Sequence, residues 1–286
     1  LADGEFSKKK YFFDKTIYEK RVYDSKGVAH PEVQIQFGPN IKDWPEMRPL
    51  SDDILLKVVS EIHDPVTTTD ELIPSGETSS FRSNPLGLAE FTLSRKDPAY
   101  VGRAKAVRDR SEEVMAEVKR AEKILEEKYP EFKGRIEKAG LGSTIYAVKP
   151  GDGSAREQAA SCQRVLGASA NIASDYATKR YRSNLINWGM IPFLYKQGEP
   201  QNSVLLSEFS GENSRNLLPN GLPFANGDYI FVPGAKKMIA EKLPSIKAYA
   251  VRADGTTAEF ELTTGDMTDD ERKIIQAGCL INFYRG

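Results

Sequence analysis

Cysteine and histidine are scarce in this chain. Its 286 residues include only Cys162, Cys279, His30 and His63. An iron–sulfur cluster takes three or four thiolates, and a structural zinc ion takes four Cys or His ligands. Both cysteines lie in apolar, periodic stretches, a setting typical of buried free thiols. The composition therefore predicts no metal site within the chain itself.

An excess of charge and long apolar runs are also absent. The chain has 40 Lys and Arg against 41 Asp and Glu, a net charge of −1. This balance gives no global attraction to nucleic acid or to an anionic membrane, so an anionic ligand would need a local cluster of cations. No run approaches the ~20 apolar residues of a membrane span, and no signal-peptide core is visible. We therefore predict a cytoplasmic protein that binds neither nucleic acid nor membrane.

What is present fits a globular protein preceded by an arm. Hydrophobic residues make up 40% and charged residues 28%, which allows a buried core. Residues 1–50 are poorly periodic and rich in Pro toward their end, so we predict an N-terminal arm or interdomain linker with a short strand at 33–37. Residues 51–286 are predicted to form one domain. The chain begins at Leu1 rather than Met, which favours a fragment or a processed piece.

Strand and helix patterns alternate through the middle of the chain. A Thr/Ser/Pro/Gly-rich loop at 64–87 is long enough to suggest a functional role. The periodicity predicts an amphipathic helix over 98–128 and strand–helix alternation after it. The predicted strands are 54–59, 143–148, 170–173 and 191–195, and the predicted helices after the first are 156–166 and 178–188. Such alternation indicates parallel pairing in an α/β layer.

The last third has short strands separated by turns. Strands are predicted at 204–206, 229–232, 246–252 and 258–262. Asp254-Gly255 is a hairpin signal, and Thr268-Asp-Asp-Glu271 has the form of a capping box that opens a helix ending at Gly278. A closing strand is predicted at 280–284. The fold class that follows is α/β, a parallel α/β core with additional antiparallel or barrel-like strands.

The turn Gly151-Asp-Gly-Ser-Ala-Arg156 joins a predicted strand to a predicted helix. Glycines allow close backbone approach, a helix N-terminus presents N–H groups to an anion, and Arg156 can fork onto a carboxylate. Ser154 could cap the helix, or its alkoxide could be stabilised by those groups; the pattern leaves both open. The turn lacks a key residue of three other motifs. It has neither the third glycine of a dinucleotide fingerprint nor the Lys of a P-loop, and it has no second glycine of a nucleophile elbow.

The loop at 64–87 carries a second candidate pair, Asp70 and Arg82. Taken alone, Asp70 is typical of a turn and Arg82 of an exposed surface. Together with Ser154 and Arg156 they could frame a pocket for a polycarboxylate. A Ser–His–Asp triad would instead require one of only two histidines to meet Ser154 by chance.

Three segments resemble motifs of the aconitase family, and they stand in the family's order. Thr68-Thr-Asp70 with Pro74-Ser-Gly76 resembles the Thr-Thr-Asp-His-x-x-x-x-Gly loop, and Arg82 falls six residues past the glycine. Gly151-x-Gly-Ser-Ala-Arg-Glu157 resembles Gly-x-Gly-Ser-Ser-Arg-Glu-His. Ser183-Asn-Leu-Ile-Asn-Trp-Gly-Met-Ile-Pro192 resembles Thr-Asn-Leu-x-x-x-Gly-Leu-Leu-Pro. The resemblance covers about residues 52–286.

The resemblance implies the swivelling, β/β/α-type C-terminal domain of a hydro-lyase that dehydrates and hydrates a citrate-like hydroxy polycarboxylic acid. By motif position Ser154 would be the catalytic base, and Asp70 would orient a partner in the opposing domains. Arg82, Arg156 and the position of Ala155 would bind substrate. It also implies a 4Fe-4S cluster on cluster-bearing N-terminal domains or a large subunit, outside this chain.

Three positions depart from the family's pattern. Ala155 replaces the second serine, Glu71 replaces the histidine after Asp70, and Gln158 replaces the histidine after Glu157. A carboxylate at position 71 would repel an anionic substrate unless it is paired or turned away. A degenerate, non-catalytic aconitase-like binding protein is therefore the alternative. In either case the isolated chain is predicted to be inactive.

Overall fold

The computed structural model describes residues 12–20, 26–34, 36–196 and 217–285, and it divides the chain into two compact units, Leu1–Pro39 and Asn40–Gly286. In the smaller unit the described residues form one short helix, α1 (Thr16–Glu19). The strands predicted at 33–37 and 204–206 lie partly and wholly outside the described residues. The domain boundary expected near residue 50 stays a prediction.

The larger unit is built on a closed barrel whose strand order is β1-β3-β5-β6-β9-β8-β7. β1, β3, β5 and β6 pair in parallel, whereas the pairs that involve β7, β8 or β9 are antiparallel. The predicted parallel α/β core with additional antiparallel strands is confirmed. The strands are β1 (Ile54–Ile62), β3 (Gly140–Ala147), β5 (Ala170–Ala173), β6 (Ile191–Leu194), β7 (Tyr229–Val232), β8 (Ser245–Val251) and β9 (Thr257–Thr263).

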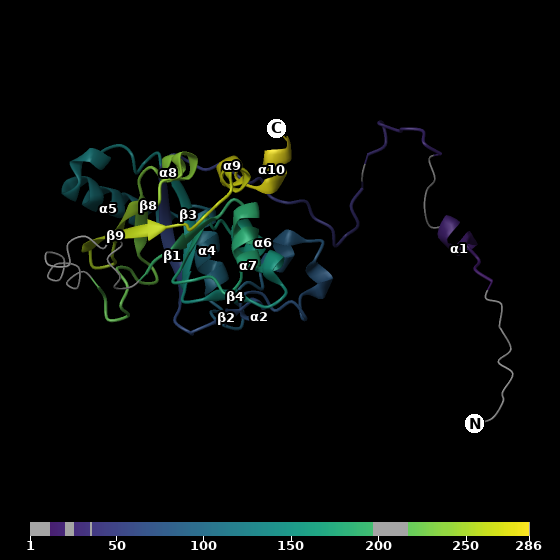
Figure 1. Ribbon diagram of the computed structural model, residues 1–286, viewed down its shortest axis with the longest axis horizontal. Helices are drawn as coiled ribbons and strands as arrows, with labels where there is room; N and C mark the ends of the chain where they lie inside the picture. Colours follow the sequence, from purple (N-terminus) through teal and green to yellow (C-terminus); the bar gives the residue numbers. More distant parts are fainter. Residues whose placement is uncertain (1–11, 21–25, 35, 197–216, 286) are drawn as a thin grey trace, which may run out of the picture. The chain divides into compact units, whose positions relative to one another are not determined.

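Burial on both faces explains the near-continuous apolar sequence of β1. Ile54, Leu56 and Val58 join one core cluster, while Leu55 and Val59 join the other. Alternate side chains of a strand point to opposite faces, so both faces of β1 are covered. The cluster of Leu55 and Val59 also contains most of the buried apolar side chains of the helices between Tyr100 and Asn187, which lie outside the barrel (Figure 1).

The predicted helix over 98–128 is two helices, α4 (Tyr100–Arg108) and α5 (Glu112–Lys128). The single long helix was wrong because Arg110 takes a left-handed conformation at φ +52°. Ser111 then caps α5 by accepting a hydrogen bond from the backbone N–H of Val114. The predicted apolar face is confirmed, because all of its members are buried: Val107, Val114, Val118, Ala121 and Leu125. No described helix is both long and apolar enough to cross a membrane.

The segment predicted as a loop, 64–87, contains short regular elements. They are β2 (Thr67–Thr68), α2 (Thr69–Leu72), the 3-10 turn η1 (Ser79–Phe81) and the start of α3 (Pro85–Ala89). Thr68 and Glu71 form a capping box on α2, and Asn84 caps α3 with Pro85 in its first turn. Figure 1 shows β2, α2 and β4 (Pro150–Asp152) together at one end of the barrel.

The sequence predicted most, but not all, of the remaining helices. α6 (Arg156–Val165) and α7 (Lys179–Asn187) match the predicted helices closely, whereas α8 (Ala235–Glu241) and the 3-10 turn η2 (Pro130–Phe132) were not predicted. The capping box at Thr268 and Glu271 opens α9 (Asp269–Ala277), as predicted.

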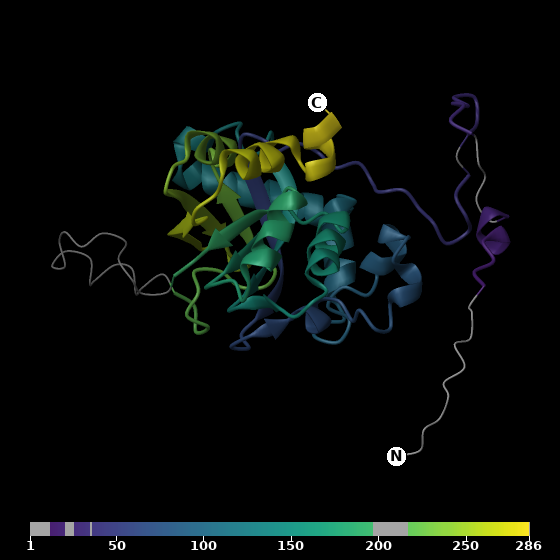
Figure 2. The ribbon, with the colours of Figure 1, turned by 45° about the vertical axis from the view of Figure 1, so that its right-hand side comes forward.

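The predicted closing strand at 280–284 was wrong. The segment forms α10 (Leu280–Arg285), which packs against α9. The seven strands already close the barrel, so no edge is left for this segment to join. Figure 2 shows α9 and α10, in yellow, outside the strands.

Candidate functional site

Two sequence motifs meet where β2 and β4 pair in parallel. Thr67 is opposite Pro150, and Thr68 is opposite Asp152. One residue further along, the backbone N–H of Ala155 donates a hydrogen bond of 3.3 Å to Oγ1 of Thr69. The Thr68–Asp70 motif therefore supports the turn that carries Ser154 and Arg156.

The glycines of this turn are required by both conformation and space. Gly151 has φ +98° and Gly153 has φ +130°. A Cβ atom at Gly151 would overlap the ring of Tyr181, and one at Gly153 would overlap Oγ1 of Thr69. L-residues with a side chain rarely adopt these angles, so glycine alone lets the turn sit against both neighbours.

Ser154 does not cap the helix that follows it. The N-cap residue of α6 is Ala155, and no side chain accepts a hydrogen bond from the first turn. The Ser154 side chain is exposed, and no described residue hydrogen-bonds its hydroxyl. Of the two roles that the sequence left open for Ser154, helix capping is absent here, and the hydroxyl is free to meet a ligand.

Ser154 and Arg156 line one open pocket of about 330 Å³. The first half of α7 also lines the pocket and contributes two cations, Lys179 and Arg180. Nε of Arg156 is buried and has no hydrogen-bond partner among the described residues. An unpaired buried donor is costly, and a bound carboxylate would satisfy it. The full lining is Ser154, Arg156, Glu157, Lys179, Arg180, Ser183 and Asn184.

The lining contains a single carboxylate, Glu157, and that side chain has a partner. Nε1 of Trp188 donates a hydrogen bond of 3.0 Å to Oε1 of Glu157. The Trp188 ring in turn contacts that of Trp44, with 4.3 Å between centroids. Cations thus outnumber anions in the pocket, which favours an anionic ligand.

Glu71, the most conspicuous departure from the resembled motif, is paired within its own helix cap. Its carboxylate accepts hydrogen bonds from the backbone N–H of Thr68 at 2.7 Å and from the Thr68 hydroxyl at 2.9 Å. The Thr68 backbone N–H is the main cause that lowers the pKa of Glu71, and the Thr68 hydroxyl and the Lys96 ammonium lower it further. The carboxylate is not among the groups that line the pocket.

The remaining predicted site residues lie outside the pocket lining. Asp70 is exposed and forms an ion pair of 2.6 Å with Arg95, which also binds Glu77. Arg82 is exposed at the end of the η1 turn, and no described residue pairs with it. The Ala155 side chain is buried. Substrate and interface roles for these three residues stay predictions.

The sequence reasoning missed the residues of α7 as part of the site. Lys179 and Arg180 meet Arg156 only through the packing of α7 against α6 and the Gly151 turn. Thr178 links the two elements, because its hydroxyl donates to the Gly151 carbonyl at 3.1 Å and accepts from the Tyr181 N–H. The sequence does show two adjacent cations at the start of a predicted helix, but such a pair does not reveal which other residues it faces.

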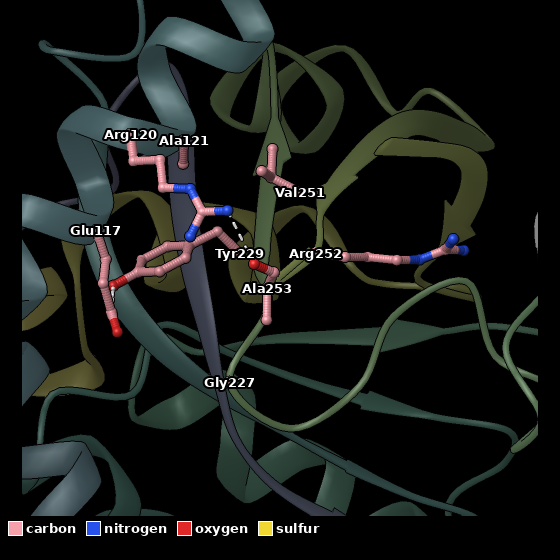
Figure 3. A pocket seen from close by; sticks show the side chains of 8 residues that line it. All are labelled: Glu117, Arg120, Ala121, Gly227, Tyr229, Val251, Arg252 and Ala253. Atoms are coloured by element: carbon pink, nitrogen blue, oxygen red, sulfur yellow. Dashed lines mark hydrogen bonds between the residues drawn. The ribbon is translucent and has the colours of Figure 1, made fainter. Parts of the chain in front are cut away.

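A second, smaller pocket lies between α5, β7 and β8 (Figure 3), with a volume of about 100 Å³. Its polar groups bond to one another: the Tyr229 hydroxyl donates to Glu117 at 2.8 Å, and Arg120 donates to the Ala253 carbonyl at 2.9 Å. The Arg252 side chain points away from the other lining residues in Figure 3. This pocket therefore offers a ligand fewer unpaired groups than the pocket beside Ser154.

The residues of this chain do not suit an iron–sulfur cluster. Cys162 and Cys279 are both buried, and burial raises the pKa of the Cys162 thiol to about 12. Cluster ligands are thiolates. In the described ranges, no group of three or more His, Cys, Asp or Glu side chains is placed to hold a metal ion.

Residues 104–198 match the sequence profile of the aconitase C-terminal domain. No curated protein sequence matches the chain. Among solved structures, the chain is similar to a crystal structure of 3-isopropylmalate dehydratase from Methanocaldococcus jannaschii, with 20% identity and a TM-score of 0.43 over 82% of this chain and 93% of that chain. The similarity to the aconitase C-terminal domain thus extends over residues 104–198, which include the Ser154 turn and α7.

Proposed function

We propose that this chain supplies the serine-and-arginine half of a hydro-lyase site. The site would reversibly dehydrate a citrate-like hydroxy polycarboxylic acid to the acid with a carbon–carbon double bond. One observation carries the proposal. Ser154, with a free hydroxyl, and Arg156, with an unpaired buried Nε, line the same cation-rich pocket. A carboxylate ligand would pair with the guanidinium and bring its own α-carbon toward the serine.

In the dehydration direction, Ser154 as alkoxide takes the proton from the carbon beside the bound carboxylate. The electron pair of that C–H bond forms the double bond as hydroxide leaves the neighbouring carbon, and the proton and the hydroxide together make the water released. An alkoxide needs strong stabilisation at neutral pH. The uncapped N-terminus of α6 and the cations Arg156 and Lys179 provide positive potential at this position.

The departing hydroxide needs its own polarising group, and the described residues form no metal site that could supply one. The iron–sulfur cluster implied by the family resemblance would be held by N-terminal domains or by a large subunit. Asp70, exposed next to the Thr69 that supports the Ser154 turn, is proposed to orient that partner, and Arg82, also exposed, is proposed to bind a substrate carboxylate. By itself the chain would bind carboxylates weakly and catalyse no turnover.

The test is activity of the complete assembly. The tagged chain is purified with its natural partner, iron and sulfide are quantified, and hydration of an unsaturated tricarboxylate is followed by the loss of ultraviolet absorbance of the conjugated acid. We expect turnover from the assembly and none from the chain alone. An assembly that contains the cluster and binds the acid but does not turn it over would favour the non-catalytic alternative. Turnover by the chain alone would refute the division of the site.

A further inference from the structure

The pocket beside Ser154 has a second wall to which the family resemblance assigns no role. Lys179 and Arg180 begin α7, and both side chains are exposed at the pocket. The start of this helix is held in place, because Thr178 accepts from the Tyr181 N–H and donates to the carbonyl of Gly151. The two cations are therefore carried on a fixed backbone directly beside the turn that carries Ser154.

These two cations are not paired within the protein. Neither Lys179 nor Arg180 forms an ion pair or a side-chain hydrogen bond with any residue in the described part of the chain. Nearby cations behave differently: Lys149 pairs with Asp175 at 3.2 Å, and Arg95 pairs with Asp70. An unpaired Lys–Arg pair in the same pocket as Arg156 concentrates positive charge in one small volume.

The pocket draws its cations from two helices. Arg156 lies on the α6 side and the two cations lie on the α7 side, with the polar side chains of Ser183 and Asn184 beside them. A volume of about 330 Å³ is at the lower end of the range for small-molecule sites. Cations from two helices therefore line one pocket, which favours a ligand with more than one anionic group.

We propose that Lys179 and Arg180 form a second carboxylate subsite that determines specificity, so that the pocket takes acids with at least two carboxylates, one on Arg156 and one on the α7 pair. This inference rests on the proposed function, because it assumes that the Ser154 pocket is the substrate site. It makes hydroxy acids with a single carboxylate poor ligands. It also assigns substrate selection to residues outside the three motifs.

Binding to the purified chain tests the subsite separately from catalysis. Citrate, propionate and inorganic phosphate are titrated and followed by backbone amide chemical shifts. The double variant K179Q/R180Q should bind citrate roughly 10-fold more weakly, because two charge-assisted contacts to a carboxylate are lost at a partly exposed site. Its affinity for propionate should stay unchanged, whereas R156Q should weaken the binding of both acids. K123Q/K237Q, which removes two exposed cations from other helices, is the matched control for net charge.

The outcomes separate the two proposals. Citrate binding that depends on Arg156 but not on the α7 pair would overturn the subsite and leave the proposed function standing. The carboxylate subsite would likewise be overturned if K179Q/R180Q and K123Q/K237Q weakened citrate binding equally. It would also be overturned if phosphate bound as tightly as citrate. If citrate changes the chemical shift of neither the Ser154 nor the Arg156 amide, the proposed function of this pocket is refuted, and the subsite with it.

Discussion

The backbone N–H of Ala155 donates a hydrogen bond to the Thr69 hydroxyl at 3.3 Å. These residues are far apart in sequence, and each belongs to a motif that resembles the aconitase family. Thr69 is 2% exposed, so the bond is shielded from water. It ties the turn of Ser154 to the loop of Asp70, and the geometry of one motif therefore depends on the other.

Replacing Thr69 by Val should loosen this connection. The variant keeps the side-chain shape but leaves the buried Ala155 N–H without its acceptor, at a cost of about 1–2 kcal/mol in the free energy of unfolding. Urea denaturation measures the loss, and citrate binding should weaken with it. Thr69→Ser retains the hydroxyl and should stay close to wild type. A stable Thr69→Val beside a destabilised Thr69→Ser would show that the methyl group matters rather than the hydrogen bond.

Replacing Gly151 by Ala should be markedly destabilising. The new Cβ would overlap the buried Tyr181 ring as well as strain a backbone at φ +98°. Gly227→Ala is the matched control, because Gly227 has the same φ and nothing within 4 Å of the added atom. We expect a loss of about 3 kcal/mol or more at Gly151 and about 1 kcal/mol at Gly227, measured by thermal and urea unfolding. Similar losses at the two positions would contradict a close approach to Tyr181.

The Glu71 cap should give a defined pH dependence. Its pKa in the folded protein is lowered from the ordinary 4.5, chiefly by the Thr68 N–H. The stability it contributes is therefore present above that value and is lost as the pH falls through the folded pKa. Glu71→Gln should cost about 0.5–1 kcal/mol at pH 7, and the difference from wild type should vanish in acid.

Glu122 provides a control of opposite sign for that measurement. Burial, followed by repulsion from Glu126 and Glu137, raises the pKa of Glu122. Its ionised form is thus unfavourable in the folded state, and Glu122→Gln should raise stability near pH 7 and change nothing in acid. If both variants followed the same trend with pH, the assignment of Glu71 as a paired cap would be wrong.

Local chemistry made much of this fold predictable from sequence. The Thr268–Glu271 capping box, the Asp254-Gly255 turn and glycines 167 and 189 act over a few residues, and the elements that they bound were found. The break at Arg110 was missed, because no glycine or proline announces it. The segment 280–284 is apolar at strand length, and only the closed barrel excludes it from the sheet.

The candidate site was predictable in part for the same reason. Ser154 and Arg156 lie in one turn, so their proximity follows from sequence. Lys179 and Arg180 enter the pocket through the packing of α7, and the Trp188 bond that engages Glu157 spans 31 residues. The N-cap position of α6 falls on Ala155 rather than Ser154, and the Ala155 N–H bonds to Thr69, 86 residues away, which no local pattern encodes.

The most direct test of the central claim is the turnover of Ser154→Ala in the complete enzyme, assembled with its cluster-bearing partner. Loss of the base should lower kcat by roughly 10²–10⁴-fold and leave KM for the polycarboxylate nearly unchanged. Ser83→Ala, an exposed serine outside the pocket, should keep full activity. Turnover of Ser154→Ala at the wild-type rate would contradict the account.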